Sequence, residues 1–153
     1  MKKRFITIMV GLLVLIIIPM AGCSQSSAGA QQKNQTLQTS NLVNGTITVN
    51  SGSYYDVSFT VTSAMTNPTV IGSFQASGGS GNDIIALVLD SISFTNWSNG
   101  HQVSPLYNSG QLTTANINAS ITGTGTYYLV FSNQFSTFTS KQVSTSVNLQ
   151  WYQ

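Results

Sequence analysis

Charged residues are scarce in this sequence. The 153 residues include five Lys or Arg and three Asp or Glu, together 5% of the chain. Three of the basic residues lie at positions 2–4, so residues 23–153 carry two basic and three acidic side chains, a net charge of 2 − 3 = −1. A nucleic-acid-binding protein needs several basic side chains on one face to neutralise phosphates. The composition therefore argues against nucleic acid as a partner, and the length is that of one domain.

Histidine and cysteine are also scarce, with one of each. A Ser-His-Asp hydrolase would need His101 as its base, but residues 99–102 are typical of an exposed turn, and the chain has no Gly-x-Ser-x-Gly motif. Zinc would lack enough ligands. Asp83 and Asp90 bracket a predicted strand and would lie about 23 Å apart, too far to share a calcium ion. We therefore expect a protein that is not an enzyme and has no metal site or cofactor.

The N-terminus has the three parts of a secretory signal. Basic residues 2–4 precede an apolar stretch at 5–20, and the sequence Met20-Ala21-Gly22-Cys23 follows. This tetrapeptide resembles the lipobox of bacterial lipoproteins, with Met where Leu is commoner. The resemblance implies removal of residues 1–22 and lipidation of Cys23, which would hold the chain on the extracytoplasmic face of a membrane in the cell envelope. The alternative is an uncleaved anchor, but the apolar stretch is shorter than the roughly 20 residues that span a bilayer.

A polar segment follows the lipobox cysteine. Between Ser24 and Ser40 the only large apolar residue is Leu37, so the segment cannot bury enough apolar surface to offset the entropy of ordering. We predict a lipidated cysteine and flexible tether at residues 23–40, and a folded domain at residues 41–153. A tether of about 20 residues has a root-mean-square span of roughly 25 Å, which lifts a domain clear of lipid headgroups.

Short β-strands dominate the pattern from residue 41 onwards. Residues 55–62 and 143–152 alternate between apolar and polar, which is typical of half-buried strands, whereas 84–89 and 127–131 are continuous apolar runs that favour central strands. No window has apolar residues at helical spacing with caps. Clusters of Gly, Asn and Ser punctuate the chain and predict turns, at 50–52, 77–82, 98–100, 108–110 and 123–125. The pattern predicts an all-β fold, an antiparallel β-sandwich of seven or eight strands.

One segment of the domain carries a recognisable motif series. It consists of Gly-x-Tyr, Phe-x-Asn, aromatic-Ser and Lys-x-Val, formed by Gly125, Tyr127, Phe131, Asn133, Phe135, Ser136, Lys141 and Val143. The series resembles the end of the GOLD (Golgi dynamics) domain, a β-sandwich related to the jelly roll. The resemblance implies a GOLD-like sandwich used for protein or lipid-associated interaction. The cargo receptors of that family carry a disulfide, which a chain with one cysteine cannot form, so their role in vesicle traffic is not carried over.

Each residue of this series also has a structural interpretation. Alternation predicts that Tyr127, Leu129 and Phe131 point into the core. Asn133 follows the strand at a position suited to an Asx-turn, in which its side chain bonds the backbone two residues on. We expect Phe135 to fold back as an apolar plug and Lys141 to open the last strand. The motif therefore predicts a fold and no catalytic site.

Three residues are candidates for ligand binding. Trp97, His101 and Tyr107 lie along a stretch rich in Gly, Asn and Ser, and a flat aromatic ring beside amides suits a sugar ring. The alternative is that Trp97 closes the core at a strand end. Two functions thus remain: a lipid-anchored surface lipoprotein that binds a protein partner, or a module that binds carbohydrate such as an envelope polysaccharide.

Overall fold

The computed structural model describes residues 34–79 and 81–153. The predicted signal peptide, Cys23 and most of the predicted tether lie outside the described residues. The described chain forms eight strands and one helix, which are β1 (Leu37–Val49), β2 (Tyr54–Val61), β3 (Thr66–Ser77), β4 (Ile84–Asp90), α1 (Ser91–Ser98), β5 (Tyr107–Leu112), β6 (Thr114–Ser120), β7 (Gly125–Ser132) and β8 (Lys141–Tyr152).

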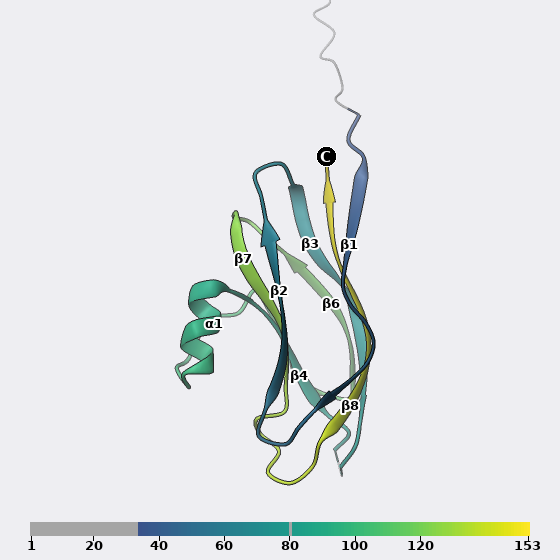
Figure 1. Cartoon of the computed structure of the whole chain (residues 1–153), viewed down its shortest axis with the longest axis vertical. Coiled ribbons are helices and arrows are strands. Elements are labelled where there is room, and N and C mark those ends of the chain that lie inside the picture. The colour runs from purple at the N-terminus through teal and green to yellow at the C-terminus, as the bar shows by residue number, and fades with distance from the viewer. Residues whose placement is uncertain (1–33, 80) are drawn as a thin grey trace, which may run out of the picture. The chain divides into compact units, whose positions relative to one another are not determined.

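The strands form two antiparallel four-stranded sheets that pack face to face (Figure 1). The strand orders are β1-β8-β3-β6 and β2-β7-β4-β5. Every connection crosses from one sheet to the other except the one between β4 and β5, which are neighbours in the same sheet. This is the jelly-roll form of the β-sandwich. It confirms the predicted all-β class and the predicted number of strands.

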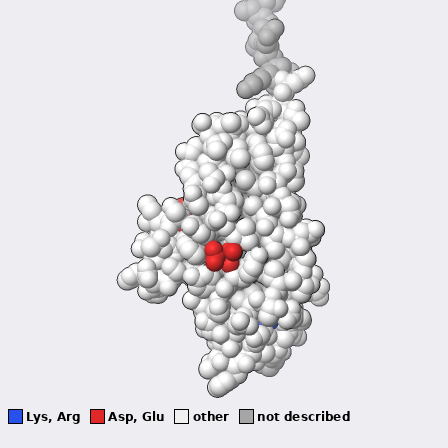
Figure 2. Space-filling view, in the orientation of Figure 1, with Lys and Arg blue, Asp and Glu red and all other residues white. Residues whose placement is uncertain are grey.

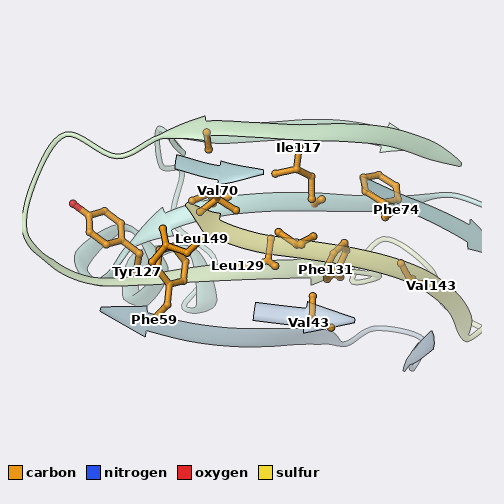
Figure 3. Close-up of a cluster of buried hydrophobic side chains, with 14 of the residues drawn as sticks. Val43, Phe59, Val70, Phe74, Ile117, Tyr127, Leu129, Phe131, Val143 and Leu149 are labelled. Atoms are coloured by element: carbon orange, nitrogen blue, oxygen red, sulfur yellow. The ribbon is translucent and has the colours of Figure 1, made fainter. Parts of the chain in front are cut away.

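The core lies between the two sheets, where alternate residues of both meet (Figure 3). In β8, Val143, Val147 and Leu149 are buried while Ser144 and Ser146 are exposed, as the alternation predicts. From the facing sheet β7 contributes side chains that are also buried, those of Tyr127, Leu129 and Phe131. The prediction that these side chains point into the core is confirmed.

Strands β4 and β7 are buried on both faces, which explains their continuous apolar sequences. The inward residues of β4 pack in the main core, and its outward residues Leu87 and Leu89 form a second cluster with Val130 of β7. Both strands are central in their sheet, as predicted. What covers their outer face is the segment between β4 and β5, with α1 standing outside the sheet (Figure 1).

The sequence interpretation missed helix α1. Its residues contain no buried side chain, so hydrophobic periodicity does not reveal it. It forms because Asp90 caps its first turn, accepting a hydrogen bond from the backbone N–H of Ser93 at 2.7 Å. It ends in a Schellman arrangement, with Gly100 in the left-handed region and N–H bonds from Gly100 to Trp97 and from His101 to Asn96. The predicted turn at 98–100 is this helix end.

The first strand begins earlier than the predicted domain boundary. Leu37 pairs with Tyr152 of β8, so residues 37–40 of the predicted tether belong to β1. These residues bury little apolar surface, but their backbone groups pair with β8, and this hydrogen bonding stabilises the start of the strand. Within residues 34–79 and 81–153, no helix has the length and apolar character needed to cross a membrane.

Candidate functional site

Residues 91–106, which we call the cover, pack across the outer face of the β2-β7-β4-β5 sheet. Four aromatic side chains hold the cover in place. Phe94 stacks on Tyr128 of β7 with ring centroids 3.9 Å apart and planes 6° from parallel. Tyr54 of β2 meets Trp97 edge to face at 5.0 Å and Phe94 at 6.1 Å. These contacts fix the cover to two strands and set the orientation of Trp97.

A cavity of about 530 Å³, which we call the cover cavity, lies between the cover and the sheet. Trp97 comes from α1 and His101 from the loop after it, while β4, β5 and β7 supply the lining residues on the sheet side. Six of its eleven lining residues are apolar or aromatic and five carry polar side chains, the full set being Ile85, Leu87, Trp97, His101, Gln102, Val103, Pro105, Asn108, Ser132, Gln134 and Phe135. The volume lies within the range of about 300–1,000 Å³ that is typical of small-molecule sites.

The cover cavity is uncharged. Among its described lining residues none is Asp, Glu, Lys or Arg, and His101, which is exposed, is its one titratable side chain. Few charged atoms appear on the face of the molecule drawn in Figure 2. Hydrogen bonding in the cavity therefore depends on side-chain amides, a hydroxyl and an imidazole, which are those of Gln102, Asn108, Gln134, Ser132 and His101.

The structure brings two of the three predicted ligand-binding residues together and separates the third. Trp97 and His101 line the cover cavity, and the prediction that His101 lies in an exposed turn is confirmed. Tyr107 points the other way, packs against the main core, and donates a hydrogen bond to the carbonyl of Asn116 at 2.8 Å. Burial raises the pKa of the Tyr107 hydroxyl. Because successive β5 side chains alternate, the cavity receives Asn108 instead.

Residues 133–140, which we call the distal loop, connect β7 to β8. The predicted Asx-turn at Asn133 is wrong. The side chain is fully buried, and its amide donates to three carbonyls, Thr139 at 2.8 Å and Val49 and Asn50 at 3.2 Å each. The backbone carbonyl of Asn133, not its side chain, accepts the bond from the N–H of Ser136. Asn133 thus ties the distal loop to the β1–β2 turn, a contact between residues more than 80 positions apart.

The predicted apolar plug at Phe135 is also wrong. Phe135 is 38% exposed and lines the cover cavity instead of entering the core. The buried aromatic side chain near the end of β7 is that of Phe131, which packs against Phe74 with centroids 5.8 Å apart. Phe138, a residue that sequence reasoning did not single out, is 93% exposed. The distal loop therefore presents two aromatic side chains to solvent.

Lys141 opens β8 as predicted, but its environment was not foreseen. It is buried, and its ammonium group contacts Asp83 at 2.9 Å and the carbonyl of Gly78 at 2.9 Å. The hydrogen bond from Lys141 lowers the pKa of the Asp83 carboxyl, to which Gln111 also donates at 2.6 Å. This ion pair joins the β3–β4 loop to β8. A pair 58 positions apart leaves no local signal in the sequence.

The two aspartates at the ends of β4 therefore have structural partners. Asp83 pairs with Lys141, and Asp90 caps α1. In the part of the chain that the structure describes, no three His, Cys, Asp or Glu side chains come together as metal ligands would. Comparison with protein-family models and with curated proteins finds no match for the chain.

Proposed function

We propose that this chain is a non-enzymatic lipoprotein, held on the extracytoplasmic face of a membrane through Cys23, whose GOLD-like sandwich binds a protein partner. The anchor rests on the lipobox sequence. The kinship with GOLD domains rests on the motif residues 125–143, of which Tyr127, Phe131 and Val143 are core residues. The observation that carries the protein-binding role is the exposure of Phe138 on an ordered distal loop.

Phe138 lies far from the point where the chain enters the domain. Leu37 pairs with Tyr152 at one end of the sandwich, and Val49 pairs with Lys141 at the other (Figure 1). Leu37 and Val49 are twelve steps apart along an extended strand, a distance of about 40 Å. A domain tethered through its N-terminus can therefore present the distal loop away from its own membrane, toward a partner.

The distal loop is held in shape before any partner arrives. Asn133 bonds three carbonyls, and the Ser136 hydroxyl donates to the carbonyl of Thr139 at 2.9 Å and accepts from its N–H at 3.3 Å. The Lys141 ammonium lies 5.9 Å from the centre of the Phe135 ring. Aromatic side chains on preorganised loops contribute strongly to protein interfaces because little entropy is lost on binding.

The chemistry of the partner follows from the charge of the loop. Lys141 is the one Lys or Arg after residue 33, and Asp83 neutralises it. Residues 133–140 contain no charged side chain. Binding would therefore depend on an apolar pocket that receives Phe138 and on hydrogen bonds to the surrounding hydroxyls and amides, with little long-range steering.

Site-specific photo-crosslinking in cells tests this function. A photoreactive phenylalanine analogue replaces Phe138 in the full-length chain, and the matched control places it at Ile92, which is 73% exposed on α1. We expect a discrete protein adduct from position 138 and not from position 92. Adducts with lipid alone, or the same adducts from both positions, would contradict a protein-binding distal loop.

The anchor is tested separately by mass spectrometry of the mature N-terminus. We expect a chain that starts at Cys23 and carries acyl groups, and a Cys23→Ser variant that is released from membranes. An unmodified Cys23 with residues 1–22 still attached would contradict the anchored lipoprotein.

A further inference from the structure

We infer that the cover cavity is a binding site for a neutral saccharide, with one sugar ring stacked on Trp97. This site is separate from the proposed protein contact at Phe138. Four features of the cavity carry the inference: its volume, the fixed indole, the mixed lining and the lack of charge.

The indole of Trp97 is set in place before a ligand arrives. Its contacts with Tyr54 at 5.0 Å and Phe94 at 6.2 Å restrict rotation, and Phe94 is in turn stacked on Tyr128. Trp97 is nevertheless partly exposed, and it lines the cover cavity. Trp97 packs against the apolar cluster of Leu87, Leu89 and Val130, and it also borders the cavity of about 530 Å³. An aromatic face held in this way suits the apolar C–H face of a sugar ring, because the contact loses little conformational entropy.

The polar lining suits hydroxyl groups. Gln102, Asn108 and Gln134 each carry an amide that both donates and accepts hydrogen bonds, and a sugar hydroxyl does the same. The oxygen of the Asn108 amide accepts from the N–H of Gly110 at 2.8 Å, which turns its NH₂ group into a fixed donor. A purely apolar ligand could not bond the NH₂ donors that it covers, and each buried donor left without a partner costs about 1–3 kcal/mol.

The absence of charge selects among saccharides. An acidic sugar or a phosphate would need a cationic side chain, and none of the described lining residues is Lys or Arg. A cationic ligand would likewise find no carboxylate there. Desolvating an unpaired charge is far costlier than desolvating a hydroxyl. A neutral, hydroxyl-rich ring with one apolar face is the ligand class that satisfies both the amides and Trp97.

Titration of the purified full-length mature protein with defined oligosaccharides tests the inference. The neutral probes are cellohexaose, mannohexaose and chitohexaose, and the acidic probe is trigalacturonate. We expect at least one neutral probe to bind and to shift the tryptophan fluorescence, and trigalacturonate not to bind. We expect Trp97→Ala to weaken binding at least tenfold, while Ile92→Ala on the exposed side of α1 leaves it unchanged.

Trp97→Ala could also weaken binding by disturbing the packing of the cover, so a second variant leaves that packing intact. Asn108→Asp keeps the oxygen that accepts from Gly110 but replaces the NH₂ donor with an oxygen, so we expect the affinity to fall severalfold in a protein with an unchanged circular dichroism spectrum. The inference is overturned if no neutral probe binds, if trigalacturonate binds best, or if binding is indifferent to both substitutions. Capture of uncharged peptides in place of sugars, abolished by Trp97→Ala, would also overturn it.

Discussion

The outer faces of the two sheets differ. On the β1-β8-β3-β6 sheet the outer face of β8 carries exposed Gln142, Ser144 and Ser146. On the β2-β7-β4-β5 sheet the outer positions of β4 and β7 include Leu87, Leu89 and Val130, all buried beneath the cover. The same fold thus has one bare sheet and one covered sheet.

This difference shows what a continuous apolar strand means in a two-layer sandwich. A strand with one buried face alternates between apolar and polar residues, as β8 does, whereas a strand with two buried faces does not. The run at 84–89 therefore predicts more than a central strand: it also indicates that another segment packs on the outside. Here that segment is the cover, which also supplies Trp97 and His101 to the lining of the cover cavity.

The largest change in stability is expected when an apolar side chain beneath the cover is shortened. Leu89→Ala deletes a fully buried side chain, so we expect it to lower the free energy of unfolding by about 2–5 kcal/mol. Ser146→Ala, on the bare face, is the matched control and should change it by no more than about 0.5 kcal/mol. Urea denaturation measures both. Equal effects would mean that the cover does not stabilise the outer face of β4.

A smaller effect is expected at the contact between the two sheets. Lys141→Met removes the ammonium that bonds Asp83 and the carbonyl of Gly78, while its alkyl chain volume is kept. We expect a loss of about 1–3 kcal/mol, because the partner groups are left with fewer hydrogen bonds. Urea denaturation at pH 7 checks the value. A variant as stable as the original would show that water replaces both bonds without cost.

The same pair predicts a dependence of stability on pH. Lys141 lowers the pKa of Asp83 in the folded protein, so the pair's contribution is present above the unfolded carboxyl pKa of about 3.9 and is lost as the pH falls through the lower folded pKa. We expect stability to decrease from pH 4 toward pH 2, and to decrease less in Asp83→Asn. Thermal unfolding across this range is the measurement, and parallel curves for the two proteins would refute the assignment.

The smallest predicted effect concerns the start of the cover. Asp90→Ala removes the cap of α1, and we expect a loss of about 1 kcal/mol and faster amide exchange in residues 91–98. Asp90→Asn retains a cap acceptor and should behave nearly as the original does. Hydrogen exchange followed by mass spectrometry measures the exchange rates of residues 91–98 in each variant. Unchanged exchange in Asp90→Ala would show that the aromatic contacts of Phe94 alone hold the helix.

Much of the fold was predictable because strand patterns are local. The alternation at 143–152 and the runs at 84–89 and 127–131 correctly predict which residues face the core and which strands are central. The sequence also places Trp97 and His101 close together. It does not separate Tyr107 from them, because the start of β5 decides which of its side chains face the core. Helix α1 escapes detection because it buries no side chain and depends on Asp90 and Gly100.

By itself, the sequence determined the all-β class, the inward and outward faces of the main strands, and the near-absence of charge, since each depends on composition or on neighbours two residues apart. Only the tertiary structure decided that the cover lies over one sheet, that Asn133 bonds the β1–β2 turn and that Lys141 pairs with Asp83. These contacts join residues remote in sequence, and the energy that selects them arises only when both sheets are in place.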